Sequence, residues 1–570
     1  MSEDGFVPSL ATAANGSVGG RLLTRQQFLR TAAVVGVSTA LSPWLSRPAD
    51  AAAGVTAELS LFDLDFSIIQ RYRPVNLLAP HLVQVRVRFD HPNAAADLGA
   101  GMQARGAVAQ VERTGAAIRV TSTAADATLF RTGAKPVAPY ATVILDVAGP
   151  ARGSGGQAAV LAGLVRGPNN YIVASFDAGA DPSHGTVSVD VMVGGTRTRV
   201  GSARADLSAS ERYAFVVNEN VVTALVGGTH GWVPVVTVWI GELLDLRRPE
   251  VLGRYRYGFG LAGTGATASL AGLRAGYYGQ VGIRDPHVVS YPDGRPFIRA
   301  NKLYFTATNA GLGFIPTAHW GVWTLDLDDL GRIEQVGVIF FARNGLVLGD
   351  HAGHIVVDED GQSFRIAVTG WGDFAFEQVH VQYARTSQGV LRGVHVVDSH
   401  PMPLPSRFNT WDPAMARVGG RWYVAFVETR YRDYEQGFDF HPALARSPLG
   451  GRVTDLHRVG ADWSRHQTEG CILQRIGGRW YLLASDGDNR QYRVYDLRMH
   501  FLGTLSAPYV HNAIPHPMVV PVPRNGRTEY LLLTFDGTPF HPEVLGEFGT
   551  HGRFILMRAK HSQPQRVASG

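Results

Sequence analysis

The chain has 570 residues, 45% of them hydrophobic and 18% charged, with a formal net charge of +5 at pH 7. This composition is that of a packed globular protein of two or three domains. Lys and Arg are scattered without basic runs, which argues against a nucleic-acid partner, and no segment approaches the ~20 apolar residues of a transmembrane helix. We therefore expect no nucleic-acid binding and no membrane insertion. Cys471 is the single cysteine, so an internal disulfide framework is excluded.

Residues 1–53 read as an export signal and a disordered leader. A charged stretch, Thr24–Arg30, precedes an apolar run at Thr31–Leu41, and small residues follow at Arg47–Ala53, which is the order found in a secretory signal. The charged stretch resembles a twin-arginine leader, although Gln26 stands where such leaders carry the second arginine. Export by the Sec route and a plain amphipathic tail are the alternatives. We expect a secreted, extracellular protein of bacterial type.

Residues 54–281 alternate apolar and polar side chains with a period of two. In 186–193 the valines at odd positions share one face, and a Gly194-Gly195 turn follows. The stretches 171–176 and 212–217 have the same pattern. The pattern predicts an antiparallel β-sandwich.

Two parts of this region carry a resemblance. The stretches 162–173 and 257–261 resemble concanavalin A-like (laminin-G-like) jelly rolls. Such domains either bind sugars or serve as structural supports, and no binding motif decides between the two here.

Residues 282–562 contain a recurring unit, most visible as GGRWYVAF at 419–426 and GGRWYLLA at 477–484. A polar anchor stands upstream of each copy, and comparable anchors precede three further strand-like runs. The anchors lie 65, 62, 57 and 47 residues apart: Asp285, Asp350, Asp412, Glu469 and His516. Five units of this length, each built from short strands, predict a five-bladed β-propeller. The fold class is therefore all-β, with residues 563–570 left as a disordered tail.

The repeated Gly-Gly-Arg-Trp-Tyr is interpreted as a hairpin turn followed by the second strand of a blade. The glycine pair supplies the positive φ of the turn, and the aromatic residues pack between blades. The motif is then scaffolding, and the polar anchor at the hub is the functional feature.

Three of the anchors are carboxylic acids: Asp285, Asp412 and Glu469. If they converge at one phase of the repeat, their pKa values separate, because like charges at close range cannot all ionise. One carboxyl then serves as an acid and another as a base, as cleavage of a glycosidic bond requires. The alternative is that each is an ordinary turn residue.

The order Asp-Pro at 285, Asp-Pro at 412 and Glu-Gly at 469 resembles glycoside hydrolase family 43, which includes arabinanases, arabinofuranosidases and xylosidases. The resemblance implies that Asp285 is the general base, that Asp412 tunes and orients the acid, and that Glu469 is the general acid of an inverting enzyme. It also implies a histidine near the channel, His516 or else His511, which binds water or a metal. No cofactor is required, although a structural calcium at the propeller axis is an option.

Two features depart from that family. Cys471 follows Glu469-Gly470 where the family has proline. Arg284-Asp285-Pro286 also resembles a motif of the related, retaining family 32, which cleaves fructans.

Other side chains are candidates for contact with a polysaccharide or oligosaccharide substrate. His351 and His354 open the second unit, and a metal pair is the alternative reading of their spacing. Arg465-His466 precedes the predicted acid and can reach substrate hydroxyls. Tryptophans either stack on sugar rings or fill the core between blades: Trp320, Trp371, Trp411 and Trp463.

The leading hypothesis is a secreted glycosidase that acts on arabinan-type, furanoside or pentose-containing polysaccharides, cell-wall arabinan included. A fructan-cleaving or transferring enzyme and a non-catalytic carbohydrate-binding protein are the alternatives.

Overall fold

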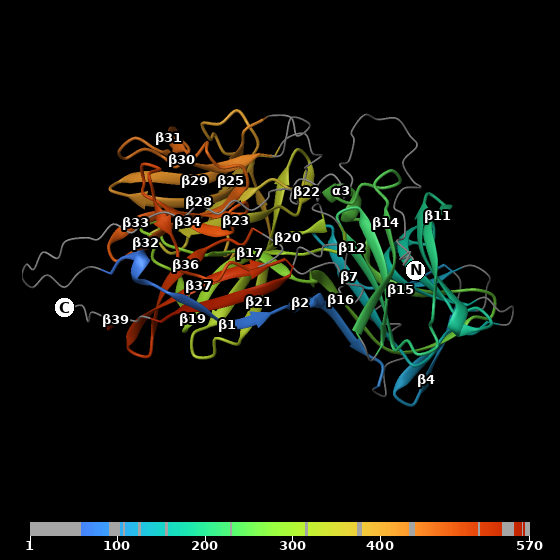
Figure 1. The fold of residues 1–570 in the computed structure, drawn as a ribbon. Helices are drawn as coiled ribbons and strands as arrows, with labels where there is room; N and C mark the ends of the chain where they lie inside the picture. Colours follow the sequence, from blue (N-terminus) through green and yellow to red (C-terminus); the bar gives the residue numbers. More distant parts are fainter. Residues whose placement is uncertain are drawn as a thin grey trace, which may run out of the picture.

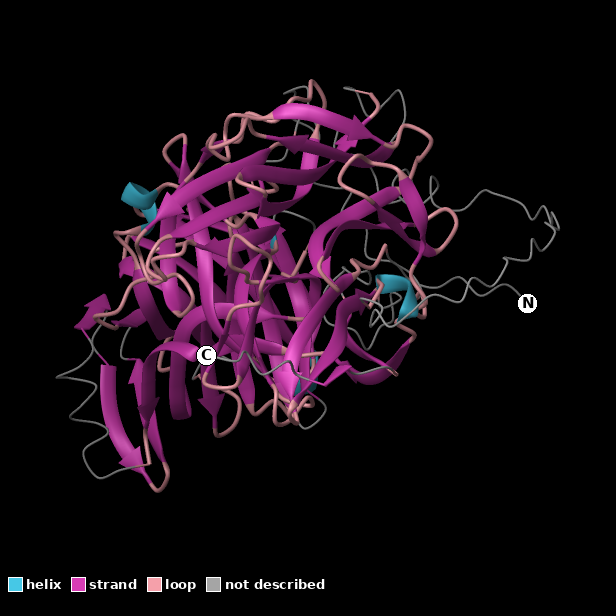
Figure 2. Ribbon diagram, turned by 90° about the vertical axis from the view of Figure 1, so that its left-hand side faces the viewer, coloured by secondary structure: helices cyan, strands magenta, loops and turns pink. Residues whose placement is uncertain are grey.

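The computed structural model describes residues 59–90, 103–106, 109–122, 127–153, 158–228, 231–313, 317–372, 379–431, 439–510, 514–537, 552–560 and 563–564. The predicted export signal and His511 lie outside these residues. Strands dominate the described chain (Figure 2), which confirms the all-β prediction. The short helices are η1 (Leu61–Asp63), η2 (Pro182–His184) and α3 (Pro249–Leu252). No helix among the described residues is long and apolar enough to cross a membrane.

Two antiparallel sheets form the predicted sandwich. The first has the order β11 (Thr196–Ala205), β10 (Gly185–Val193), β9 (Asn170–Asp177), β8 (Ala159–Gly167), β15 (Arg256–Ala262), β6 (Thr128–Arg131), β3 (Gln103–Gly106). The second has the order β14 (Gly231–Trp239), β13 (Val221–Gly228), β12 (Arg212–Asn218), β7 (Tyr140–Val147), β16 (Thr267–Gln280), β5 (Ala117–Ser122), β4 (Ala109–Thr114), and β2 (Asn76–Arg88) pairs with β16. The alternation of β10 buries Val187, Val189 and Val191 in the core between the sheets, as predicted.

The sandwich, on the right in Figure 1, packs directly on the first blade of the propeller. Tyr140 of β7 stacks on Phe340 of the blade with ring centroids 5.2 Å apart. The turn between β12 and β13 carries Glu219, whose Oε1 accepts hydrogen bonds from Tyr140 Oη (3.2 Å) and Gly349 N (3.3 Å). Burial raises the pKa of Glu219 to about 8. The sandwich therefore supports the chain that leads into the second blade.

Five sheets form the propeller. Blade one consists of β17 (Ile283–Val288), β19 (Lys302–Asn309), β20 (His319–Asp326) and β21 (Ile333–Arg343), extended by β18 (Ile298–Arg299), β22 (Leu346–Leu348) and β26 (Gly393–Asp398). Blade two consists of β23 (His351–Val357), β24 (Phe364–Thr369), β25 (Val381–Thr386) and β27 (His400–Pro401). Blade three consists of β28 (Thr410–Val418), β29 (Arg421–Thr429), β30 (Phe440–Arg446) and β31 (His457–Ala461). Blade four consists of β32 (Thr468–Ile476), β33 (Arg479–Asp486), β34 (Gln491–Tyr495) and β35 (Phe501–Thr504).

The fifth blade joins the two ends of the described chain. Its order is β36 (Met518–Arg524), β37 (Arg527–Asp536), β38 (Arg553–Ala559) and β1 (Phe66–Tyr72), and β39 (Gln563–Pro564) pairs with β37. Figure 1 shows β1, in blue, beside the red C-terminal strands. The predicted boundaries at 54 and 563 are therefore wrong, because β1 and β39 belong to the propeller. The sandwich is inserted after the strand that closes the ring.

The repeated motif forms the predicted turn and second strand. Gly419 and Gly420 have φ values of 54° and 77°, and Gly477 and Gly478 have 55° and 82°. Each pair turns the chain from the inner strand into the second strand of its blade, from β28 into β29 and from β32 into β33. The turns lie at the end of the blade opposite the polar anchors, because the anchors stand where the inner strands begin.

Candidate active site

The inner strands of blades one to four share a backbone irregularity near their first residues. In each, one residue adopts a positive φ, and the pairing register with the second strand shifts at that point. These residues are Asp285 (52°), Ala352 (53°), Asp412 (46°) and Gly470 (73°). A bulge of this kind turns a side chain out of the pleat and re-aims it. The fold repeats it four times around the hub.

This register corrects the expectation that the three acids share one phase of the repeat. Asp285 and Asp412 occupy the positive-φ position, whereas Glu469 stands one residue earlier, with Gly470 in that position. Glu469 is thus equivalent to Arg284, His351 and Trp411 of the other blades. In the second unit the equivalent pair is His351-Ala352, not Asp350, whose carboxylate is bound by Arg343.

Asp285 is held as an anion. One carboxylate oxygen accepts from Arg284 Nε at 2.9 Å, and the other accepts from Thr308 Oγ1 at 2.8 Å. Only 4% of the side chain is exposed. Burial by itself would raise the pKa of Asp285, but Arg284 and the cationic His516 outweigh it and hold that pKa well below the usual range.

Glu469 has the opposite electrostatic character. Burial, together with the negative charge of Asp412, raises the pKa of Glu469 to about 7. Trp411 Nε1 donates to Glu469 Oε2 at 3.2 Å, and Arg284 Nη2 lies 3.9 Å from Oε1. The side chain keeps 15% of its surface exposed, more than Asp285 or Asp412. Near pH 7 this carboxyl is therefore present in both its protonated and its ionised form.

His516 from the fifth blade bridges the two aspartates. Its Nε2 lies 3.2 Å from Asp412 Oδ2 and 3.5 Å from Asp285 Oδ1. Burial by itself would lower the pKa of His516, but Asp412 and Asp285 outweigh it and raise it to about 9. Asp412 Oδ2 also accepts from Gly470 N at 3.0 Å, which places Asp412 beside the acid. The prediction that His516 lies at the hub is confirmed.

Two threonines on second strands tie the bulges of the first three blades together. Thr308 Oγ1, which binds Asp285, accepts from Ala352 N at 3.2 Å. Thr369 Oγ1 accepts from Asp412 N at 3.1 Å and donates to Ala352 O at 2.8 Å. The backbone of the third blade is thereby set by the second, and the position of Asp412 depends on blade-to-blade contact.

A small cavity of about 10 Å³ lies at the hub, lined in part by Asp285, His287, Asp412, Cys471 and His516. The residues fit a structural calcium poorly, because a cationic histidine occupies the space between the two aspartates. No cluster of three or more His, Cys, Asp or Glu suited to a metal occurs among the described residues. Burial raises the pKa of the Cys471 thiol well above its usual value, which agrees with an inert thiol.

The predicted substrate histidines of blade two differ in their surroundings. His354 is fully engaged, because Nε2 contacts Ser290 Oγ at 3.0 Å and Nδ1 accepts from Met415 N at 3.1 Å. Burial lowers its pKa to about 3. The prediction that His354 contacts substrate is therefore wrong, as is the alternative that it binds a metal. Both of its ring nitrogens are used in contacts within the protein. His351 stands at the hub position and stacks on Trp371, with ring centroids 6.0 Å apart.

The tryptophans divide between core and site. Trp320 is completely buried. Trp411 is 1% exposed and donates its indole hydrogen bond to Glu469, so its ring has no free face on which a sugar could stack. Trp371 is half-buried, and its ring centroid lies 6.1 Å from that of Trp411, so the two tryptophans lie side by side next to Glu469. Trp463 is 46% exposed on the connection between blades three and four.

His466 lies on the same connection, where its Nδ1 contacts Asp439 Oδ2 at 2.7 Å. It is 56% exposed and touches none of the three acids. A substrate contact from this outer position stays a prediction, as do those of His351 and Trp371.

Sequence reasoning missed three side chains of the site. In the sequence, Arg284 is visible as part of a motif, but not as the cation that contacts both Asp285 and Glu469. Its place next to Asp285 was the available signal. Thr308 and Thr369 carried none, because a threonine within an apolar strand is ordinary and only the assembled ring brings them to the bulges.

No family model matches the chain, and no curated protein matches it. Among solved structures, the chain is similar to a GH43_1 enzyme from Xanthomonas citri, at 16% identity and a TM-score of 0.34, over 49% of this chain and 87% of that one. It is similar to Bacillus subtilis levansucrase at 10% identity and a TM-score of 0.34, over 51% and 86%. The carbohydrate-binding module CBM66 from Bacillus subtilis matches at 10% identity and a TM-score of 0.22, over 30% and 93%. Since these scores lie below 0.5, the chemistry is inferred from the site itself.

Proposed function

We propose that the protein is a glycoside hydrolase that cleaves furanoside or pentose-containing polysaccharides of the arabinan type. One observation carries the proposal: at a single hub, Asp285 is held ionised while the pKa of Glu469 is raised to about 7. A base and a protonated acid that coexist near neutral pH are what hydrolysis of a glycosidic bond needs.

Each residue has a distinct task in this mechanism. Glu469 protonates the leaving oxygen, and Trp411 orients it through Oε2, which leaves Oε1 for the substrate. Asp285 removes a proton from the attacking water. Asp412 keeps the pKa of Glu469 high and holds His516 in place. Arg284 joins acid and base and stabilises negative charge as the proton leaves Glu469.

Inversion is proposed from the order of the Asp-Pro, Asp-Pro and Glu-Gly motifs. Proton NMR of the first anomer released from the cleaved substrate tests it, because inversion and retention give opposite anomers. A retained anomer from levan would support the fructan-cleaving alternative, which Arg284-Asp285-Pro286 favours.

The decisive experiment is a screen of the purified protein against arabinan, xylan, levan and cell-wall arabinogalactan, with chromatography of the products. Glu469→Gln and Asp285→Asn should each lower the rate by at least about a hundredfold, because each removes a proton-transfer group. Glu529→Gln, a carboxylate of the fifth blade that pairs with Arg524 at 3.3 Å, is the matched control. No cleavage of any polymer, with sugar binding unaffected by Glu469→Gln, would favour a non-catalytic binding protein.

Export is part of the proposal and rests on the pattern of residues 1–53. Expression of the full chain in a bacterial host, followed by N-terminal sequencing of the protein outside the cytoplasm, tests it. Protein retained in the cytoplasm with Met1 intact would contradict it.

A further inference from the structure

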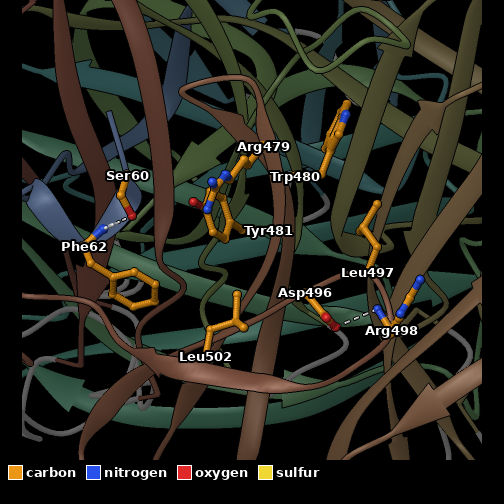
Figure 3. A pocket seen from close by; sticks show the side chains of 9 residues that line it. All are labelled: Ser60, Phe62, Arg479, Trp480, Tyr481, Asp496, Leu497, Arg498 and Leu502. Carbon is orange, nitrogen blue, oxygen red and sulfur yellow. Dashed lines mark hydrogen bonds between the residues drawn. The ribbon is translucent and has the colours of Figure 1, made fainter. Parts of the chain in front are cut away.

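A hollow on the described surface lies away from the acids, on the outer part of blade four. This groove, of about 640 Å³, is formed where η1 meets the start of β33 and the turn before β35. Figure 3 shows the side chains that line it. Its apolar and aromatic wall includes Phe62, Trp480, Tyr481 and Leu502. Phe62 and Leu502 are 41% and 45% exposed, so the wall is open to solvent at these two side chains, whereas Tyr481 is buried beneath them.

The groove contains the second copy of the repeated motif, and the two copies differ in their surroundings. In the first copy, Arg421 donates to Ser447 O at 3.4 Å, and Trp422 is buried beneath the Arg365 guanidinium, 5.1 Å from the ring centroid. In the second copy, Trp480 is only half-buried and Arg479 is exposed. The arginine and tryptophan of the motif are thus enclosed by the scaffold in blade three and more exposed in blade four, whereas the tyrosine is buried in both.

The groove also has a net positive charge. Arg479 and Arg498 line it, and within the described residues neither guanidinium has a hydrogen bond or an ion pair with the protein. Asp496, the acid of the groove, is already engaged: it accepts from the backbone N of Arg498 (2.8 Å) and His500 (2.9 Å), and its other oxygen contacts His500 Nδ1 at 2.9 Å. Two cations therefore flank the aromatic wall, and the ionised Asp496 forms its contacts with its own turn rather than with either guanidinium.

We propose that this groove is a second carbohydrate site, which binds a polysaccharide bearing carboxylates, that is, a chain of uronic acid residues. The aromatic wall suits the apolar faces of sugar rings, and a guanidinium matches a carboxylate with two parallel hydrogen bonds. A neutral glycan would form no ionic contact with either arginine. The proposal goes beyond hydrolysis at the hub and does not depend on it.

The site is remote from the acids. Glu469 and Ile476 are seven residues apart on β32, and Ile476 pairs with Arg479. At about 3.3 Å per residue this separates the groove from Glu469 by roughly 23 Å. A polymer bound here tethers the protein to its substrate matrix without occupying the hub.

Isothermal titration with polygalacturonate tests the proposal, with debranched arabinan as the neutral polymer and dextran sulfate as a non-specific polyanion. The full chain should bind polygalacturonate, more weakly as salt rises. Arg479→Ala with Arg498→Ala should weaken binding about tenfold or more, because hydrogen bonds to charged groups are lost. Arg475→Ala is the matched control, since Arg475 is exposed on the same hairpin but does not line the groove.

A second variant avoids any effect of truncation. Leu502→Glu introduces a like charge at an exposed position and should weaken binding, whereas Leu502→Lys should not. Equal binding of arabinan and polygalacturonate, or equal losses for Arg475→Ala and the double variant, would overturn the proposal. So would the absence of binding to polygalacturonate. Cleavage of small substrates should be unchanged in all these variants, so failure here is separate from failure of the proposed hydrolase.

Discussion

Replacement of Arg284 by methionine should shift the pH dependence of the site as a whole toward alkaline pH. Arg284 Nη2 lies 3.9 Å from Glu469 Oε1, and Nε lies 2.9 Å from Asp285 Oδ1. A unit charge at 3.9 Å with an effective dielectric constant of about 20 contributes about 4 kcal/mol, which corresponds to at most ~3 pKa units. Because the guanidinium stabilises both carboxylates, the pKa of each should rise when it is removed, by about 1–3 units.

The expected profile follows from the two acids. The proposed mechanism needs Glu469 protonated and Asp285 ionised, so kcat/KM of the parent protein should fall on the alkaline side near pH 7. In Arg284→Met that limb should move to about pH 8 or above, and the acidic limb should move up with it. Carbon-13 NMR of labelled glutamate carboxyls, with Glu469→Gln used to assign the signal, gives the same pKa without an activity assay.

Two controls define the result. Arg284→Lys keeps a charge and should move both limbs less than methionine does. Arg475→Met, at the other end of β32, should leave them in place. An alkaline limb that stays near pH 7 or moves to lower pH in Arg284→Met would refute the coupling of acid and base through this arginine.

Three further outcomes are expected. Gly470→Ala places a Cβ 2.5 Å from the His516 ring at a φ of 73°, and it should lower the free energy of unfolding in denaturant by on the order of 2 kcal/mol or more. Gly526→Ala, at a φ of 70° but in open space, should lower it less. Equal losses of stability in the two variants would contradict the clash. The pKa of His516 is raised from 6.5 to about 9, and this shift contributes about 3 kcal/mol to the free energy of unfolding. The contribution is fully present below pH 6.5 and is lost as pH rises through 9. The denaturant midpoint of the parent should therefore fall between pH 6 and pH 10, and that of His516→Gln should change less. Deletion of residues 59–73 removes β1 from the fifth blade and should lower Tm by at least ~5 °C, whereas a chain starting at Gly54 should melt like the parent; an unchanged Tm would show that the ring does not need this strand.

The repeat in the sequence predicted the blades well because its signals are local. The period-two pattern, the glycine pairs and the spacing of the anchors each depend on a few neighbouring residues. They placed Asp285, Asp412 and Glu469 on the inner strands of blades one, three and four. The position of each acid relative to its bulge could not be predicted from the sequence, because a bulge is defined by pairing with a second strand rather than by residue type. One extra residue at each bulge decides which side chain enters the hub.

Residue identity and order by themselves determined an all-β chain, five blade units and the carboxyls that belong to the hub, since these follow from side-chain patterning along short segments. Closure of the ring by β1, the bridge of His516 between two aspartates and the contact of Arg284 with Glu469 join residues from opposite ends of the chain or from different blades. Which carboxyl is ionised also depends on these contacts. Burial and neighbouring charge set a pKa, and both exist only once the blades have closed around the hub.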